Sequence, residues 1–170
     1  MASASPSTLN ALSFLPETAA DAAAIELVLD RAFGPGRFAK PSERVREFAR
    51  HNRRLSLCAW HEGALVGCCR IYDVSVGGAP ALFLGPLAID PAAQHHGFGH
   101  ALVIATLDLC RASGAGALIL MGEPSFFSVL GFSQTNGKVI MPVPSEARRL
   151  QWIALRDGAL ETLGGIVGAP

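Results

Sequence analysis

Residues 85–102 read Gly85-Pro-Leu-Ala-Ile-Asp-Pro-Ala-Ala-Gln94-His-His-Gly97-Phe-Gly99-His-Ala-Leu102. An apolar strand ends at Asp90, a short loop follows, and two glycines open a helix. Glycine lets a phosphate approach the backbone, and the first N–H groups of a helix have no partner within it. With the positive end of the helix dipole, these groups form a site for an anion such as a pyrophosphate. A tight turn that serves only packing would have the same sequence pattern, so the anion site and the packing turn both remain possible interpretations.

The composition of the strand before this loop and of the helix after it predicts that both are buried. Residues 81–89 contain no charged side chain and several leucines, which predicts a strand at the centre of a sheet. Because the nitrogen of Pro86 cannot donate a hydrogen bond, we expect the strand to bulge there or to stop pairing on one side. Residues 98–111 are apolar nearly all round, as expected for a helix packed on a sheet.

The rest of the chain alternates between apolar runs and turn residues. Helices are predicted from Thr18, the expected N-cap, to Gly34 and from Ser42 onward, with the arginines of the second helix facing outward. Further strands are predicted at residues 12–15, 55–60, 64–74, 117–121 and 150–155 and from Phe132 onward, and a short helix at residues 124–130. This order predicts a mixed α/β (α+β) sheet domain and not an alternating, doubly wound one.

The composition predicts one soluble domain. Half of the 170 residues are apolar, 16% are charged and the formal net charge is zero, so nothing favours disorder, nucleic-acid binding or an anionic membrane. No apolar run approaches the roughly 20 residues that span a bilayer. We expect residues 1–11 to be a flexible lead-in and residues 12–170 to form a single domain. Four cysteines without metal-ligand spacing are expected to be reduced and buried, which favours the cytoplasm.

One segment departs from this even charge. Between Arg31 and Arg54, eight basic residues accompany only two acidic ones, Glu43 and Glu47. A solvated helix face and a site for an anionic substrate or partner both explain the excess. The sequence leaves this choice open.

Two motifs resemble those of the GNAT N-acetyltransferase superfamily. Gln94-x-x-Gly97-x-Gly99, preceded by the strand, is similar to that superfamily's Q/R-x-x-G-x-G/A signature. The segment Met121-Gly-Glu-Pro-Ser-Phe-Phe-Ser-Val-Leu-Gly131-Phe132 resembles its second motif, in the form found in the bacterial branch that carries G-[DE]-P, an aromatic pair and G-F. The resemblance covers about residues 12–132.

The resemblance implies a GNAT-like fold and a coenzyme A co-substrate. The fold would be a mixed, mostly antiparallel twisted sheet of about seven strands, splayed between strands 81–89 and 117–121, with about four helices. Acetyl-CoA or coenzyme A would contact these residues: Leu87, Ala88 and Ile89 along the pantetheine arm; Gln94, His95, His96, Gly97, Phe98, Gly99 and His100 around the pyrophosphate; and Phe127. We expect valine at Gly97 or Gly99 to weaken cofactor binding through a clash at the phosphate and to leave the fold largely intact. No metal is expected, because no carboxylate or cysteine accompanies the histidines at ligand spacing.

The implied reaction is direct transfer of an acetyl group from acetyl-CoA to a primary amine of a small molecule or protein. In many members a tyrosine four residues before the Gly-Phe glycine is the general acid, and that position here is Phe127. Residues 74–89 contain no ionisable side chain, so Glu123 is the nearest candidate for acid–base catalysis, although it could instead cap the helix that begins at Pro124. A non-catalytic acyl-CoA sensor and a domain that binds no cofactor are the alternative functions. The expected partner is a small-molecule or peptide amine, with no nucleic acid or membrane, and the apolar C-terminal segment allows a homodimer.

Overall fold

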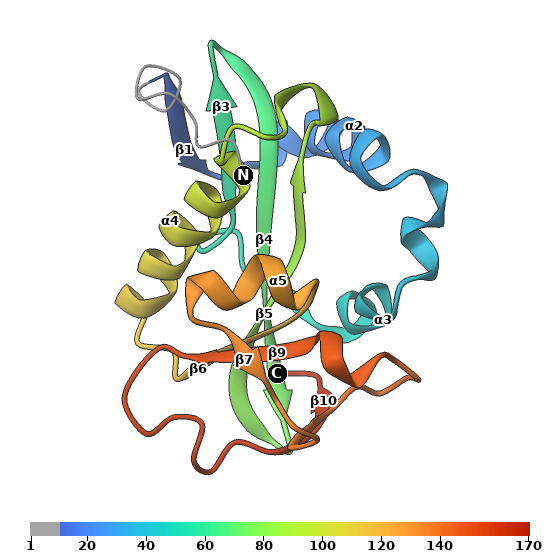
Figure 1. The fold of residues 1–170 in the computed structure, drawn as a ribbon, viewed down its shortest axis with the longest axis vertical. Coiled ribbons are helices and arrows are strands. Elements are labelled where there is room, and N and C mark those ends of the chain that lie inside the picture. Colours follow the sequence, from blue (N-terminus) through green and yellow to red (C-terminus); the bar gives the residue numbers. More distant parts are fainter. Residues whose placement is uncertain (1–10) are drawn as a thin grey trace.

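A twisted sheet forms the centre of the protein in the computed structural model, which describes residues 11–170 (Figure 1). The main strand order is β1-β3-β4-β5-β6-β9-β7, and all of these neighbours are antiparallel except the parallel pair β5 and β6. The strands are β1 (Leu12–Pro16), β3 (Leu57–His61), β4 (Ala64–Val76), β5 (Ala79–Ile89), β6 (Ala117–Met121), β9 (Leu150–Ala154) and β7 (Ser133–Gln134). Short strands β2 (Arg50–His51) and β10 (Gly165–Gly168) pair with β4, and β8 (Val139–Ile140) pairs with β10. The predicted mixed, mostly antiparallel sheet is confirmed.

Helices cover both faces of this sheet. Figure 1 shows α2 (Ala22–Phe33) and α3 (Pro41–Phe48) on one side and α4 (Phe98–Ala112) on the other, near the short α5 (Pro124–Phe127). Five 3₁₀ turns complete the described chain: η1 (Ala19–Asp21), η2 (Pro35–Ala39), η3 (Pro91–Ala93), η4 (Ser128–Leu130) and η5 (Ala147–Arg149). The predicted lead-in of residues 1–11 lies almost entirely outside the described residues. Within residues 11–170, no helix has both the length and the apolar character needed to cross a bilayer.

The alternation of side chains along β4 distributes the core between the two faces. Cys68 packs with Ile25 and Leu29 of α2, whereas the adjacent Cys69 packs with Leu102 of α4. All four cysteines are free and buried, as the sequence predicts, and burial raises the pKa of the Cys58 thiol to about 12. At neutral pH these thiols remain protonated core residues.

Strand β5 bulges where Pro86 lies. Its antiparallel register with β4 shifts between Cys69 and Ile71, which leaves Gly85 and Pro86 out of the regular ladder. On the other side, β5 pairs with β6 only over Leu82–Leu84. The two central strands therefore separate beyond Leu84, which confirms the predicted splay.

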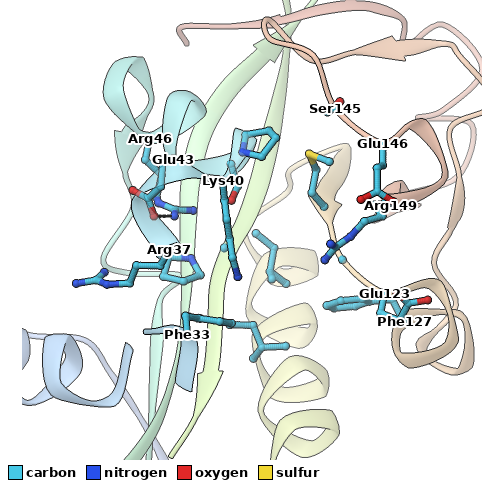
Figure 2. Close-up of a pocket in the computed structure, with 18 of the residues that line it drawn as sticks. Phe33, Arg37, Lys40, Glu43, Arg46, Glu123, Phe127, Ser145, Glu146 and Arg149 are labelled. Atoms are coloured by element: carbon cyan, nitrogen blue, oxygen red, sulfur yellow. Dashed lines mark hydrogen bonds and ion pairs between the residues drawn. The ribbon is translucent and has the colours of Figure 1, made fainter. Parts of the chain in front are cut away.

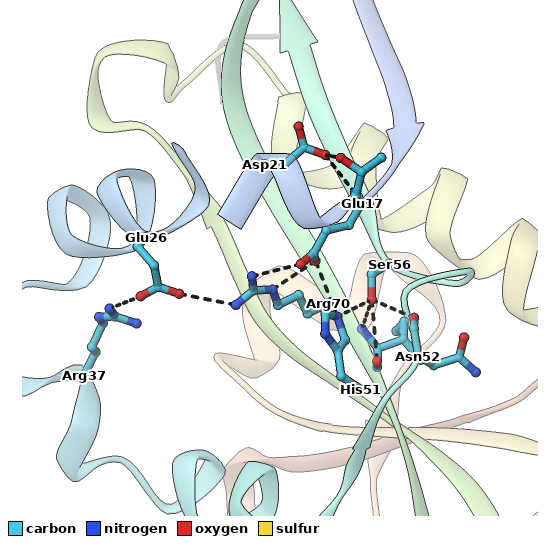
Figure 3. Close-up of polar contacts among 10 residues, drawn as sticks. Glu17, Asp21, Glu26, Arg37, His51, Asn52, Ser56 and Arg70 are labelled. Atoms are coloured by element: carbon cyan, nitrogen blue, oxygen red, sulfur yellow. Dashed lines mark hydrogen bonds and ion pairs between the residues drawn. The ribbon is translucent and has the colours of Figure 1, made fainter. Parts of the chain in front are cut away.

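A chain of partly buried ion pairs joins Glu17, just after β1, to β4, α2 and η2 (Figure 3). Glu17, only 5% exposed, accepts two hydrogen bonds from Arg70, from Nη2 at 2.9 Å and from Nε at 3.0 Å, and its carboxylate lies 3.4 Å from His51 Nε2. Arg70 also contacts Glu26 at 3.5 Å, and Glu26 accepts a hydrogen bond from Arg37 at 2.5 Å. Since Arg37 belongs to η2, this network fixes the connection between α2 and α3 against the sheet.

Candidate active site

A cavity of about 720 Å³ opens where β5 and β6 separate (Figure 2). Leu84 and Leu87 of β5 and Met121 of β6 contribute to its lining. One wall of the cavity is formed by residues of α2, η2 and α3. The opposite wall is formed by α5, residues 144–146 and Arg149. The cavity therefore reaches the gap in the sheet from the face that α2 and α3 cover.

The last three residues of β5 have one free edge beside this gap. Leu87, Ala88 and Ile89 pair with β4 through Cys69, Cys68 and Gly67. Among the described strands, none pairs with the opposite edge of these three residues. A free strand edge is a row of backbone donors and acceptors, so an extended ligand with amide groups can bind there as an added strand.

The loop after β5 presents unpaired backbone amides. No hydrogen bond within residues 11–170 uses the N–H groups of residues 95–100. His95 and Gly97 both adopt the left-handed conformation, with φ of 68° and 77°. A side chain at Gly97 would point into open space, because no atom lies within 4 Å of where its Cβ would be. These free amides at the N-terminus of α4 have the chemistry of an anion site.

Gln94 holds the loop that carries these amides. Its side-chain Nε2 donates a hydrogen bond to the carbonyl oxygen of Ile89 at 3.1 Å. Asp90 supports the same turn, since its carboxylate accepts a hydrogen bond from the N–H of Ala92 at 3.0 Å. Gln94 therefore ties the loop to the end of β5.

Gly99 has a different role from Gly97. A Cβ on Gly99 would lie 3.2 Å from the ring of Phe126, which also stacks on His100 with the centroids 4.2 Å apart. His100 Nε2 is 3.1 Å from the carbonyl oxygen of Phe126. A side chain at Gly99 would therefore require the Phe126 ring to shift by a few tenths of an ångström, so valine there would disturb the contact between α4 and α5 as well as the loop.

Phe127 and Glu123 both line the cavity. Phe127 is 7% exposed and packs edge-on against Phe126 and Phe132, so these two rings hold its ring in place. Glu123 is the residue before α5, but its side chain makes no capping hydrogen bond to that helix. Its carboxylate instead accepts a hydrogen bond from Arg148 at 3.3 Å. The interpretation of Glu123 as a helix cap is therefore wrong.

The cavity also contains two residues of the basic segment and one arginine that the sequence did not single out. The basic segment divides in the fold: the Arg44 and Arg50 side chains are 59% and 73% exposed, whereas that of Arg46 is 12% exposed and lines the cavity with Lys40. The expectation that the arginines of α3 face outward is thus wrong for Arg46, whose pKa burial lowers to about 10. Arg149 reaches the same cavity from η5, far along the chain, and no local pattern marks it.

The described residues contain no group of three or more His, Cys, Asp or Glu side chains arranged to hold a metal ion. The candidate site consists of the free edge of Leu87–Ile89, the unpaired amides in the loop that follows it, and the charged cavity, which Leu87 lines where β5 and β6 separate. Such a site can bind a long anionic ligand on one side of the sheet and a smaller polar molecule on the other.

Comparisons with known proteins agree with this geometry. The profile of the acetyltransferase (GNAT) family matches residues 22–132. The uncharacterized N-acetyltransferase YhbS of Escherichia coli strain K12 is 29% identical over 151 residues, which covers 86% of this chain and 89% of YhbS. The crystal structure of E. coli YhbS in complex with CoA has a TM-score of 0.78 at 27% identity and covers 92% of this chain and 88% of that one. A GNAT family acetyltransferase from Brucella melitensis, in complex with acetyl-CoA, has a TM-score of 0.69 at 25% identity, with 92% and 94% covered.

Proposed function

The chain belongs to the GNAT acetyltransferase family, and we propose that it transfers the acetyl group of acetyl-CoA directly to a primary amine of a small molecule or protein. One observation carries this proposal. The free edge of Leu87–Ile89 begins at the cavity, which Leu87 lines beside the splay between β5 and β6, and ends at the loop with the unpaired amides of residues 95–100. A thioester and an amine brought to this point from opposite faces of the sheet would be close enough to react.

The residues present fit coenzyme A. The pantetheine arm carries amide groups that would pair with the free edge of Leu87, Ala88 and Ile89. Its diphosphate would bind the amides of His95, His96, Gly97, Phe98, Gly99 and His100, in a loop that Gln94 holds in place. The complexes of E. coli YhbS with CoA and of the Brucella melitensis protein with acetyl-CoA support coenzyme A as the ligand.

The chemistry follows from what this site supplies. The amine nitrogen forms a bond to the acetyl carbon, the carbon–sulfur bond breaks, and the electron pair leaves with sulfur. Holding both reactants at the splay contributes about 7–11 kcal/mol to lowering the barrier. The attacking amine must also lose a proton. Glu123, in the cavity lining, is our candidate base, and Phe127 would contact the cofactor without donating a proton.

The proposal is tested by free-thiol release from acetyl-CoA. Purified protein incubated with acetyl-CoA and a broad panel of amines should release thiol well above the spontaneous rate, with acetylated amine detected by mass spectrometry. Absence of both products across the panel would contradict the proposal. Tight coenzyme A binding without thiol release would instead support a non-catalytic acyl-CoA sensor, which the apolar ring of Phe127 favours.

Glu123→Gln should lower kcat by about 100-fold, the lower end of what a general base contributes. Its affinity for coenzyme A should be unchanged when measured by calorimetry. Glu146→Gln is the matched comparison, because Glu146 also lines the cavity and contacts Arg148, at 3.2 Å. Similar losses of kcat in the two variants would mean that Glu123 acts only through its charge.

A further inference from the structure

Two of the cations that line the cavity have no carboxylate partner. Arg37 pairs with Glu26 and Asp30, and Arg46 pairs with Glu43. The remaining acidic side chains of the lining, Glu123 and Glu146, both contact Arg148. Among residues 11–170, no ion pair involves Lys40 or Arg149, so these two cations of the cavity lining lack an ionic partner.

Two buried N–H donors in the same lining also lack an acceptor. Arg46 Nη1 and Arg149 Nε are both inaccessible to solvent and form no hydrogen bond with the described residues. A buried donor without a partner costs free energy, and in this arrangement neither water nor a ligand reaches these two atoms themselves. Both donors belong to positively charged groups, for which an anion is the best acceptor.

Lys40 lies between these two arginines. Figure 2 shows its side chain extending into the cavity from one side while Arg149 extends from the other. The Lys40 ammonium lies 4.0 Å from the centroid of the Phe33 ring. The pKa of Lys40 is lowered by burial and then by the positive charges of Arg149 and Arg46, so the three cations lie close enough to repel one another.

The cation cluster (Lys40, Arg46 and Arg149) is separate from the amides proposed to bind the diphosphate. None of residues 88–100 lines the cavity. Arg46 Nη1 lies beside the β5 bulge, 3.5 Å from where a Cβ on Gly85 would be, and hence beside the splay. An anion bound here would be only a short distance from the reacting amine, on the face opposite α4.

We propose that the acceptor is a small molecule that carries a primary amine and, a few bonds away, a carboxylate or phosphate held by Lys40, Arg46 and Arg149. This inference rests on the proposed acetyl transfer. The anion would pair with Lys40 and Arg149, which have no carboxylate partner among the described residues, and would be a second anionic partner for Arg46 beside Glu43. Neutral amines of the same size would leave Lys40 and Arg149 without an anionic partner.

The test compares amines that differ only in the anionic group. Amino acids are paired with their carboxamides, and phosphorylated amino alcohols with the parent amino alcohols, at equal concentrations of unprotonated amine. Charged hydrogen bonds of this kind correspond to a preference of about tenfold to hundredfold in kcat/KM for the acidic member of a pair. The class of pair with the larger ratio identifies carboxylate or phosphate as the anion. Equal rates within every pair overturn the inference while leaving acetyl transfer intact.

Variants of the cluster provide the second measurement. Lys40→Met and Arg149→Gln should each reduce the preference for the acidic member by about threefold to tenfold by raising its KM, with coenzyme A affinity unchanged. Arg44→Gln is the matched control, because it removes an exposed charge from the same helix as Arg46. A preference that survives in both cavity variants overturns the inference.

A failure of acetyl transfer leaves the inference testable. If the protein releases no thiol with any amine, calorimetry with the same pairs is performed on the protein with and without coenzyme A. Binding of an acidic member about tenfold tighter than its neutral partner, lost in Lys40→Met, supports the anion site. Equal binding of the two members overturns it.

Discussion

Replacing Gly97 with valine should lower the affinity for coenzyme A by about tenfold to hundredfold. The φ of 77° at Gly97 is strained for any residue with a Cβ, and such strain costs about 1–3 kcal/mol. The added side chain would also project into the open space in front of the unpaired amides, where we place the diphosphate. Calorimetric titration of the variant with coenzyme A measures the loss.

Gly114→Val separates backbone strain from loss of the binding site. Gly114, just beyond the other end of α4, has a nearly identical φ of 79°, and a Cβ added there would also have no atom within 4 Å. Both variants should therefore lose similar stability in thermal unfolding. Only Gly97→Val should lose coenzyme A affinity, and equal affinities in the two variants would show that the diphosphate binds elsewhere.

Glu17→Gln should destabilise the fold by about 3–5 kcal/mol, because removing one partner leaves the buried Arg70 charge incompletely paired. For a chain of this length, this corresponds to a fall of roughly 6–20 °C in the thermal midpoint. Asp108→Asn is the control, since the Asp108–Arg111 pair is exposed and should contribute no more than about 1 kcal/mol. Equal effects of the two substitutions would contradict a special role for the buried pair.

The same pair makes stability depend on pH. Burial alone would raise the pKa of Glu17, but hydrogen bonds from His51 and Arg70 and the charge of Arg70 outweigh it and lower the pKa from 4.5 to about 2. Because the folded pKa lies below the unfolded one, the stabilisation is complete above pH 4.5 and is lost as the pH falls toward 2. Urea unfolding of the wild type should therefore show a loss on the order of 3 kcal/mol over this range that Glu17→Gln lacks.

Local sequence was sufficient for the parts of the site made by one continuous segment. The strand, loop and helix of residues 81–111 follow from apolar periodicity and from Gly97, whose left-handed backbone is a property of the residue itself. The bulge at Pro86 follows from its missing N–H, and the core positions of the cysteines from their apolar neighbours. These features depend on neighbours within a few residues, which the sequence states directly.

Tertiary packing decided which charged side chains share the cavity. Arg46 and Arg44 are two residues apart in one basic run, yet only the rotation of α3 against the sheet turns the first inward and leaves the second in solvent. Arg149 joins Lys40 because η5 lies across the splay from α3, a long-range contact that no local pattern encodes. The Glu123 side chain accepts its hydrogen bond from Arg148, which is distant in sequence, and not from the N-terminus of its own helix. Backbone conformational preference depends on residues close in sequence, so the sequence alone specifies the loop backbone that presents the amides. Burial and pairing depend on segments distant in the chain, so the charged lining exists only once the chain has folded.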